Sequence, residues 1–188
     1  MKLDSIVALP KQLVFSLTHY SSEDAMFTFI FGKKEKKSEA TQEIEQRVGI
    51  SYDPQLINKL EEDHQELVEI FTEIKTAATV GHFRRIPSKL SEFKLALQTH
   101  IVLENVRLYV YIQQSHAQDV DTSDFVTGLR SEMNGIARAV VKFAEKYTET
   151  PPEASTSANF VSALEEIGAV LVKRVQLEES RLYSLYLR

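Results

Sequence analysis

The sequence predicts an all-α fold, an antiparallel up-down four-helix bundle built from two similar helical hairpins and preceded by an N-terminal extension. Glycine and proline contribute only 6 and 5 of the 188 residues, whereas a turn-rich β-sandwich or barrel would need more. Apolar residues recur at spacings of three and four over four long stretches, which is the period of an amphipathic helix. We therefore divide the chain into an extension at residues 1–52 and a helical bundle at residues 53–188.

The first hairpin begins at Asp53-Pro54, where a good N-cap residue precedes a proline that suits the first helical position. Its first helix is predicted to end at Gly81, and Pro87 marks the first turn of the second helix. The inward stripe of the first helix is Ile57, Leu60, His64, Leu67, Phe71, Ile74 and Ala78. The stripe of the second helix is Leu90, Phe93, Leu97, His100, Glu104, Leu108 and Tyr111.

The second hairpin follows a polar segment, residues 115–124, which we predict to be a loop. The stripe of the third helix is Val126, Leu129, Met133, Ile136, Val140, Phe143 and Tyr147. Pro151-Pro152 then breaks the helical pattern. The stripe of the fourth helix is Phe160, Leu164, Ile167, Leu171, Arg174, Glu178, Leu182 and Leu185.

The two hairpins repeat one pattern, because a shift of 69 residues superimposes the stripe of the first helix on that of the third and a shift of 74 superimposes the second on the fourth. The first helix aligns with the third, so that His64 falls on Met133. The second helix aligns with the fourth, and the aligned pairs are His100 with Arg174, Glu104 with Glu178, Leu108 with Leu182 and Tyr109 with Tyr183. Two amphipathic hairpins with short loops bury their stripes best against each other, which favours the bundle.

Composition and charge exclude several classes of function. The chain has no cysteine, so thiolate metal sites, iron–sulfur clusters and cysteine nucleophiles are excluded. The net charge of −5 gives no electrostatic reason to expect direct nucleic-acid binding. No apolar stretch reaches the ~18 residues of a membrane-spanning helix, and no cleavable signal peptide is recognisable. We therefore expect a cytoplasmic protein.

The extension contains one hydrophobic segment, Met26–Phe31, followed by the lysine-rich residues 33–37. One interpretation is an apolar segment that packs on the domain. The other is a weak membrane-surface contact through Phe27, Phe29 and Phe31, with the lysines at the headgroups. Residues 38–48 are predicted to form a short polar helix.

Polar residues on an apolar stripe are the informative ones, because burying them is costly unless they are paired or bind an ion. They are His64, His100, Glu104, Arg174 and Glu178. Four-helix bundles build metal sites from inward-facing histidines and glutamates on facing helices. A set of imidazoles and carboxylates suits iron or manganese.

Two of these runs resemble the metal motifs of hemerythrin-like (HHE cation-binding) domains. Asp63-His64-Gln65-Glu66-Leu67 resembles the first motif, and His100-Ile101-Val102-Leu103-Glu104-Asn105 with Leu108-Tyr109 resembles the second. The resemblance covers residues 54–188. Members of that family bind two irons through several histidines and two bridging carboxylates, and they carry or sense oxygen or handle iron. The resemblance implies His64, His100, Glu104 and Glu178 as metal ligands.

The chain departs from that pattern at two positions. Met133 and Arg174 stand where the third and fourth helices of the family carry histidines. Methionine is a poor ligand for iron in such a setting, and arginine cannot bind a cation. We therefore predict a depleted site that holds at most one iron or manganese ion, in a sensor or regulatory protein rather than an oxygen-activating enzyme.

A second resemblance supports an alternative function. Ile167-Gly168, Leu171 and the run from Arg174 to Glu179 are similar to a stretch of the regulator-of-sigma-D family. That resemblance implies a bacterial, metal-free anti-sigma-type regulatory protein that binds a transcription component such as a sigma factor. Arg174 would then replace the metal and pair with Glu104 and Glu178, and the imidazoles would complete a closed network. On either hypothesis, Tyr109 and Tyr183 are expected to be packing residues beside the core.

Overall fold

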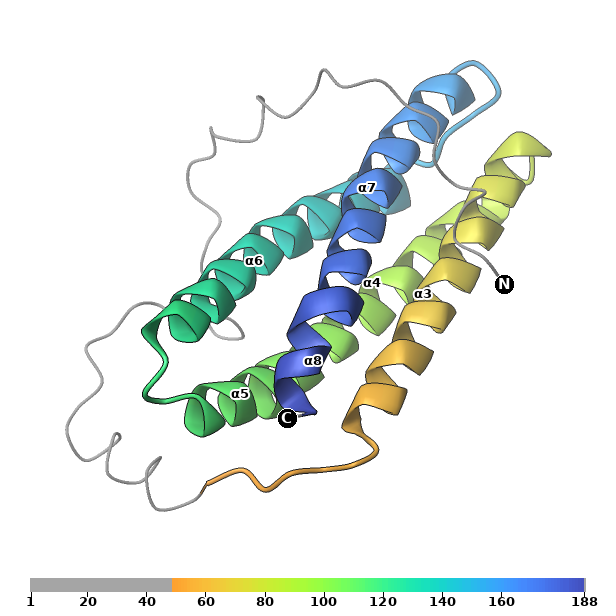
Figure 1. The fold of residues 1–188 in the computed structure, drawn as a ribbon. Helices are drawn as coiled ribbons and strands as arrows, with labels where there is room; N and C mark the ends of the chain where they lie inside the picture. Colours follow the sequence, from red (N-terminus) through yellow and green to blue (C-terminus); the bar gives the residue numbers. More distant parts are fainter. Residues whose placement is uncertain (1–48, 188) are drawn as a thin grey trace. The chain divides into compact units, whose positions relative to one another are not determined.

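The computed structural model describes residues 49–187. The hydrophobic segment at Met26–Phe31 and the polar helix predicted at 38–48 lie outside the described residues, so these predictions stay open. Every element of the described part is helical, and four long helical rods run through it (Figure 1). The predicted all-α four-helix bundle is confirmed.

The first rod is α3 (Leu56–Thr79), and a short 3₁₀ turn η2 (Phe83–Arg85) connects it to the second rod. The second rod consists of α4 (Ile86–Leu103), the π-helical turn η3 (Glu104–Leu108) and α5 (Tyr109–Ser115). The third rod is α6 (Val120–Glu149). The fourth rod consists of α7 (Ser157–Leu177), the π-helical turn η4 (Glu178–Leu182) and α8 (Tyr183–Tyr186).

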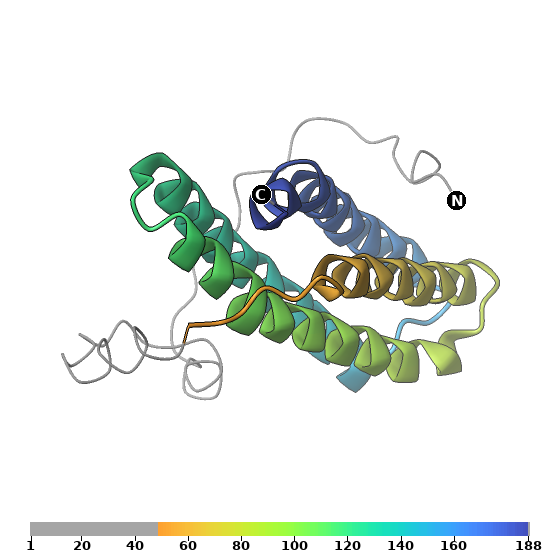
Figure 2. The same cartoon turned by 60° about the horizontal axis from the view of Figure 1, so that its bottom comes forward.

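The rods pack around a common core in the order in which the chain forms them. α3 packs against α4, α4 against α6, α6 against α7, and α7 returns to α3. Figure 2 shows this arrangement after a turn that brings the bottom of the bundle forward. Most of each predicted stripe faces the core. After the π-helical turns, however, Ile112 and Tyr186 are buried in place of Tyr111 and Leu185, which are only half-buried.

Local sequence explains where two of the rods begin. α3 begins at Leu56 rather than directly after Asp53. The Asp53 Oδ1 atom accepts a hydrogen bond of 3.0 Å from the Gln55 N–H, and the turn that this bond closes precedes the helix. α6 begins at Val120, inside the segment predicted as a loop. The Asp119 side chain caps it by accepting from the Thr122 N–H at 3.1 Å, so the loop is shorter than the polar composition suggested.

Two glycines have a definite structural role. Gly81 follows α3 with a φ of +80°, a conformation that glycine adopts at helix ends without steric cost. Gly168 on α7 faces Phe71 on α3, and a Cβ atom at this glycine would lie 2.5 Å from the Phe71 Cζ. The missing side chain therefore lets α7 accept the phenylalanine ring at this level of the bundle.

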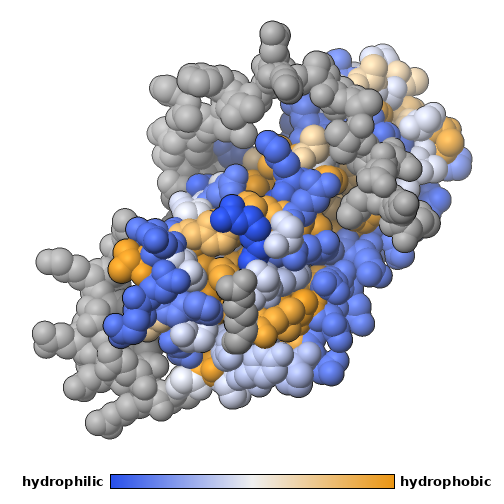
Figure 3. Space-filling view, viewed as in Figure 1, coloured by the Kyte–Doolittle hydropathy of each residue, from blue (hydrophilic) through white to orange (hydrophobic). Residues whose placement is uncertain are grey.

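The bundle interior has apolar layers on both sides of a polar level. At the end near α5 and α8 the core cluster includes Leu60, Leu108, Ile112 and Leu182. The polar level lies next to this cluster, in the middle of the rods. On the face of the described part that Figure 3 shows, hydrophilic side chains are common, with apolar ones between them. Among the described helices, none is long and apolar enough to cross a membrane.

Candidate metal centre

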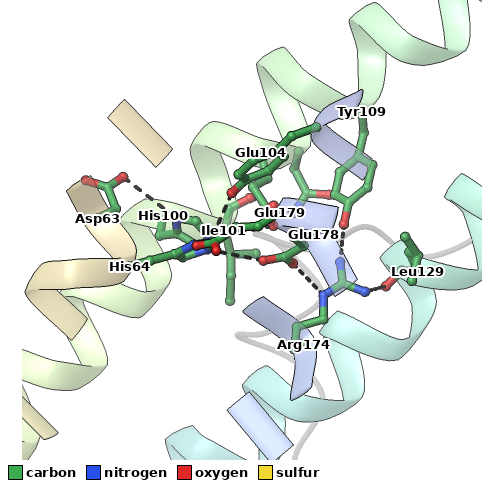
Figure 4. A network of polar contacts seen from close by, with 12 residues as sticks. Asp63, His64, His100, Ile101, Glu104, Tyr109, Leu129, Arg174, Glu178 and Glu179 are labelled. Atoms are coloured by element: carbon green, nitrogen blue, oxygen red, sulfur yellow. Dashed lines mark hydrogen bonds and ion pairs between the residues drawn. The ribbon is translucent and has the colours of Figure 1, made fainter. Parts of the chain in front are cut away.

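The polar level brings together all five polar residues that the stripes predicted, together with Asp63. The six polar residues of this level are all buried, and they are Asp63, His64, His100, Glu104, Arg174 and Glu178. Figure 4 shows that they come from α3, the α4–η3 rod and the α7–η4 rod and point toward one another. The remaining rod, α6, contributes Met133, which is buried and offers no hard donor atom.

His64 lies between two adjacent glutamates. Its Nδ1 is 3.0 Å from Glu179 Oε1, at the edge of the site, and its Nε2 is 3.2 Å from Glu178 Oε2, inside it. The outer carboxylate fixes the orientation of the ring. This is the arrangement by which carboxylates orient metal-binding histidines and direct the other ring nitrogen at the ion.

His100 repeats this arrangement with longer contacts. Its Nδ1 is 3.7 Å from Asp63 Oδ2 and its Nε2 is 3.8 Å from Glu104 Oε2. The centroids of the two imidazole rings are 4.7 Å apart. Each histidine thus has one carboxylate on its outer side and one on its inner side.

Donor atoms of three of these residues lie close enough together to share one ion. His64, His100 and Glu178 each offer one ligand atom within 4.8 Å of the others, and all three residues are buried. Glu104 adjoins this group through its contact with His100. The residues present therefore fit a metal with mixed nitrogen and oxygen ligands, such as iron or manganese.

Arg174 occupies the opposite side of Glu178. Its Nε donates a hydrogen bond of 2.5 Å to Glu178 Oε1, whose second oxygen faces His64. Its Nη2 donates to the Tyr109 hydroxyl at 2.5 Å, and its Nη1 donates to the Leu129 carbonyl at 3.2 Å. Each of the three guanidinium nitrogens therefore donates one hydrogen bond, and the group neutralises one glutamate of the pair (Figure 4).

Glu104 does not receive the same compensation. Its side chain has no exposed surface, and neither carboxylate oxygen has a hydrogen-bond partner among the described residues. The expectation that Arg174 pairs with both glutamates holds for Glu178 only. The reason is that Arg174 shares a rod with Glu178, one turn away, and its remaining N–H groups are taken by Tyr109 and Leu129. The closed metal-free network expected from the sequence does not form in full.

The surroundings shift the pKa values of these groups in different directions. Burial, reinforced by the charge of Glu178, raises the pKa of the Glu104 carboxyl well above its usual range. Burial also acts to raise the pKa of Glu178, but hydrogen bonding by His64 and the charge of Arg174 outweigh it and lower this pKa. Burial acts to lower the pKa of His64, but hydrogen bonds and charges of Glu178 and Glu179 outweigh it and raise this pKa.

Sequence reasoning missed the contribution of two tyrosines. Tyr109 and Tyr183 are buried, and their hydroxyl groups reach Arg174 and His64 respectively, so they are more than packing residues. Each follows a glutamate of the site by one π-helical turn, in which its own N–H bonds to the carbonyl of Glu104 or Glu178. The repeated Glu and Leu-Tyr spacing in the two hairpins was the available signal. Single π-turns inside α-helices occur frequently at functional sites.

Sequence reasoning also missed Asp63 and Glu179 as partners of the histidines. Both are neighbours in sequence of residues on the inward stripes, Asp63 of His64 and Glu179 of Glu178. The sequence shows that both residues are acidic, but the histidine that each one contacts depends on how the helices pack. Asp63 on α3 contacts His100 on α4, and Glu179 on η4 contacts His64 on α3.

One comparison with known proteins identifies a related family. A family model described as the hemerythrin HHE cation binding domain matches residues 55–186, which is most of the chain and all four rods. No curated protein and no solved structure matches the chain.

Proposed function

Because the chain belongs to the hemerythrin HHE cation-binding family, we propose that its polar level binds a single iron or manganese ion and that the protein acts as a sensor or regulator rather than as an enzyme. The ligands in this proposal are His64, His100, Glu104 and Glu178. The bound ion would supply Lewis acidity and an open coordination position for a small ligand.

The observation that carries the proposal is the unpartnered carboxylate of Glu104 beside two oriented histidines. Buried polar groups in native proteins almost always have partners, and an exception indicates a missing ion or water. A cation at this point would pair with Glu104 and with the inner oxygen of Glu178 at the same time. The cation would also bind the inward-facing Nε2 atoms of the two histidines, because their Nδ1 atoms contact Glu179 and Asp63.

Arg174 and Met133 support a single ion instead of a pair. Arg174 holds a permanent positive charge next to Glu178 Oε1. A second ion, as in the two-iron sites of the family, would need this oxygen as a ligand. Two unit charges 4 Å apart repel by ~4 kcal/mol at an effective dielectric of 20. Met133, which takes the place of a histidine on α6, offers no nitrogen to offset that repulsion.

The contacts of Glu178 and Arg174 suggest how binding of an ion would be transmitted to the surface of the bundle. Glu178 is shared, with one oxygen toward the ligand group and one toward Arg174. Arg174 extends this link to α6, through the Leu129 carbonyl and through Glu132 Oε2 at 3.8 Å, and the Glu132 side chain is 62% exposed. A change of charge at the ligand group therefore has a direct electrostatic path to the surface of α6, which favours a regulatory role.

Metal analysis of the purified full chain tests the proposal. After loading with ferrous iron or manganese and removal of excess ion, we expect one ion per chain. His100→Ala should lose it, while the matched control His116→Ala, on a histidine outside the site, should keep it. Two ions per chain, or none under both aerobic and anaerobic preparation, would overturn the proposal.

The hydrogen bonds of Arg174 favour a second candidate, the metal-free anti-sigma-type regulator. The guanidinium already satisfies Glu178, as a replacement for a metal would. This candidate requires a folded chain that takes up no metal and forms a complex with purified principal sigma factor. Failure of the metal-free chain to form that complex in size-exclusion chromatography would exclude the sigma-factor version.

A further inference from the structure

Tyr183 borders the same group of ligand atoms, on the side of His64. Its side chain is 2% exposed, and its ring lies nearly parallel to the His64 ring, with 6.0 Å between centroids and 11° between planes. Its hydroxyl oxygen is 3.4 Å from His64 Nε2, the nitrogen that the metal proposal assigns to the ion. A second oxygen, Glu178 Oε2, faces the same nitrogen at 3.2 Å.

The π-helical turn η4 places the tyrosine there. The Tyr183 N–H bonds to the Glu178 carbonyl five residues before it, instead of four as in an α-helix. Tyr183 therefore follows Glu178 on the same side of the rod. In a regular α-helix a residue five positions later would point away from the face that Glu178 occupies.

The Tyr183 hydroxyl has one hydrogen-bond partner among the described residues, His64 Nε2. The other ring nitrogen, Nδ1, is occupied by Glu179. When Nε2 binds an ion, the buried hydroxyl loses this partner. An oxygen atom that is buried, unpartnered and adjacent to a cation is in the position of a ligand.

The equivalent tyrosine of the other hairpin provides an internal contrast. Tyr109 is also buried and also follows a π-turn, but its hydroxyl accepts a hydrogen bond from Arg174 Nη2 at 2.5 Å. Tyr109 therefore serves the arginine side of the polar level, and Tyr183 serves the histidine side.

We infer that Tyr183 is a further ligand when the site holds ferric iron, a hard cation that prefers anionic oxygen such as that of a phenolate. This inference rests on the proposed single-metal function. Binding through the phenol oxygen would replace its O–H bond by a bond to the ion, and the proton would leave to water. The oxidation state of the ion does not change.

Visible spectroscopy of the full chain loaded with ferric iron tests this assignment, because a phenolate bound to ferric iron gives a charge-transfer band. We expect the band in the wild-type protein and its loss in Tyr183→Phe, with iron content measured in parallel. Tyr147→Phe, on a tyrosine remote from the site, should keep the band. Survival of the band in Tyr183→Phe, or its loss in Tyr109→Phe instead, would overturn the assignment.

A second measurement covers the case in which Tyr183→Phe fails to retain iron. Resonance Raman spectra of the wild-type and Tyr109→Phe proteins, excited in the band, should show phenolate modes that shift when ring-deuterated tyrosine is incorporated. Iron binding at one ion per chain without any such modes would refute the role of Tyr183 and leave the proposed function standing. Absence of iron binding in the wild type would instead refute the proposed function itself.

Discussion

Arg174 and Glu178 stand one turn apart on the same rod and are joined by a 2.5 Å hydrogen bond from Nε to Oε1, deep in the bundle. Both side chains are almost completely buried. The guanidinium donates a hydrogen bond to one carboxylate of the polar level and leaves Glu104 without a hydrogen-bond partner among the described residues. The distribution of charge in the core is therefore uneven, and this unevenness leads to the following predictions.

Removing the guanidinium should destabilise the metal-free protein strongly. Arg174→Ala leaves Glu178 buried without its partner, and breaking a buried ion pair in this way costs about 3–5 kcal/mol. Urea unfolding monitored by circular dichroism measures the loss. The control is Arg138→Ala on the exposed side of α6. Wild-type stability in Arg174→Ala would show that the pair contributes little.

Restoring histidines at the two departing positions should increase metal capacity. The double variant Met133→His with Arg174→His removes the fixed charge and adds two nitrogen donors on α6 and α7. We expect the iron content to rise from one to two ions per chain. Met133→His alone should stay at one ion, because Arg174 still occupies Glu178. A double variant that binds one ion would mean that other features limit the site.

The stability of the metal-free protein should depend on pH through His64. Its pKa is raised in the folded state, so the stability that the protonated ring contributes is fully present below its ordinary pKa of about 6.5. That contribution is lost as the pH rises through the folded-state pKa. Urea midpoints of the metal-free chain should therefore fall above pH 6.5. The pKa of Glu104 is also raised in the folded state. Its contribution to stability therefore also falls as the pH rises, and this fall begins at a lower pH than the one caused by His64.

Two controls separate these contributions. His64→Gln keeps a polar side chain without the titration, and its urea midpoints should change less between pH 6.5 and 9 than those of the wild type. At low pH the opposite sign applies to Glu178, whose lowered pKa means that its contribution is lost as the pH falls through that value. A wild-type midpoint that rises steadily from pH 6.5 to 9 would contradict the prediction for His64.

The contact between α3 and α7 should not tolerate a side chain at Gly168. The added methyl group in Gly168→Ala would meet the Phe71 ring, and overpacking of this kind costs about 1–3 kcal/mol. Gly135→Ala on α6 is the matched control, because nothing lies within 4 Å of its added Cβ and alanine favours the helix by up to ~1 kcal/mol. Thermal unfolding of both variants should give shifts of opposite sign. Adding Phe71→Leu to Gly168→Ala should recover part of the loss.

The helical stripes were sufficient to predict the four rods and the polar residues in their core. His64, His100, Glu104 and Glu178 could be predicted to face inward because their spacing follows the apolar residues around them. The pairing of Arg174 with Glu178 was predicted correctly, but the absence of a hydrogen bond from Arg174 to Glu104 was not. That choice between the two glutamates depends on the side-chain conformation of the arginine and on the carbonyl and hydroxyl groups it meets on other rods.

The π-turns were the other feature outside the reach of sequence periodicity. The helical period predicts a regular α-helix through residues 104–111 and 178–186, which places Tyr109 and Tyr183 beside the core. Each π-turn changes the phase of the rod after its glutamate and brings the tyrosine into the site. No residue type demands a π-turn, so the sequence alone does not reveal where the phase changes.

Arg174 is part of the polypeptide, so its positive charge is in place as soon as the chain has been made. In the proposed metal-bound state, the ligand group beside it depends on an ion that the cell must provide. One side of the polar core would then be complete from biosynthesis onward, while the other side would vary with the supply of metal. Without metal, the proposed site would keep the compensation of Glu178 by Arg174, while Glu104 would lose its cation.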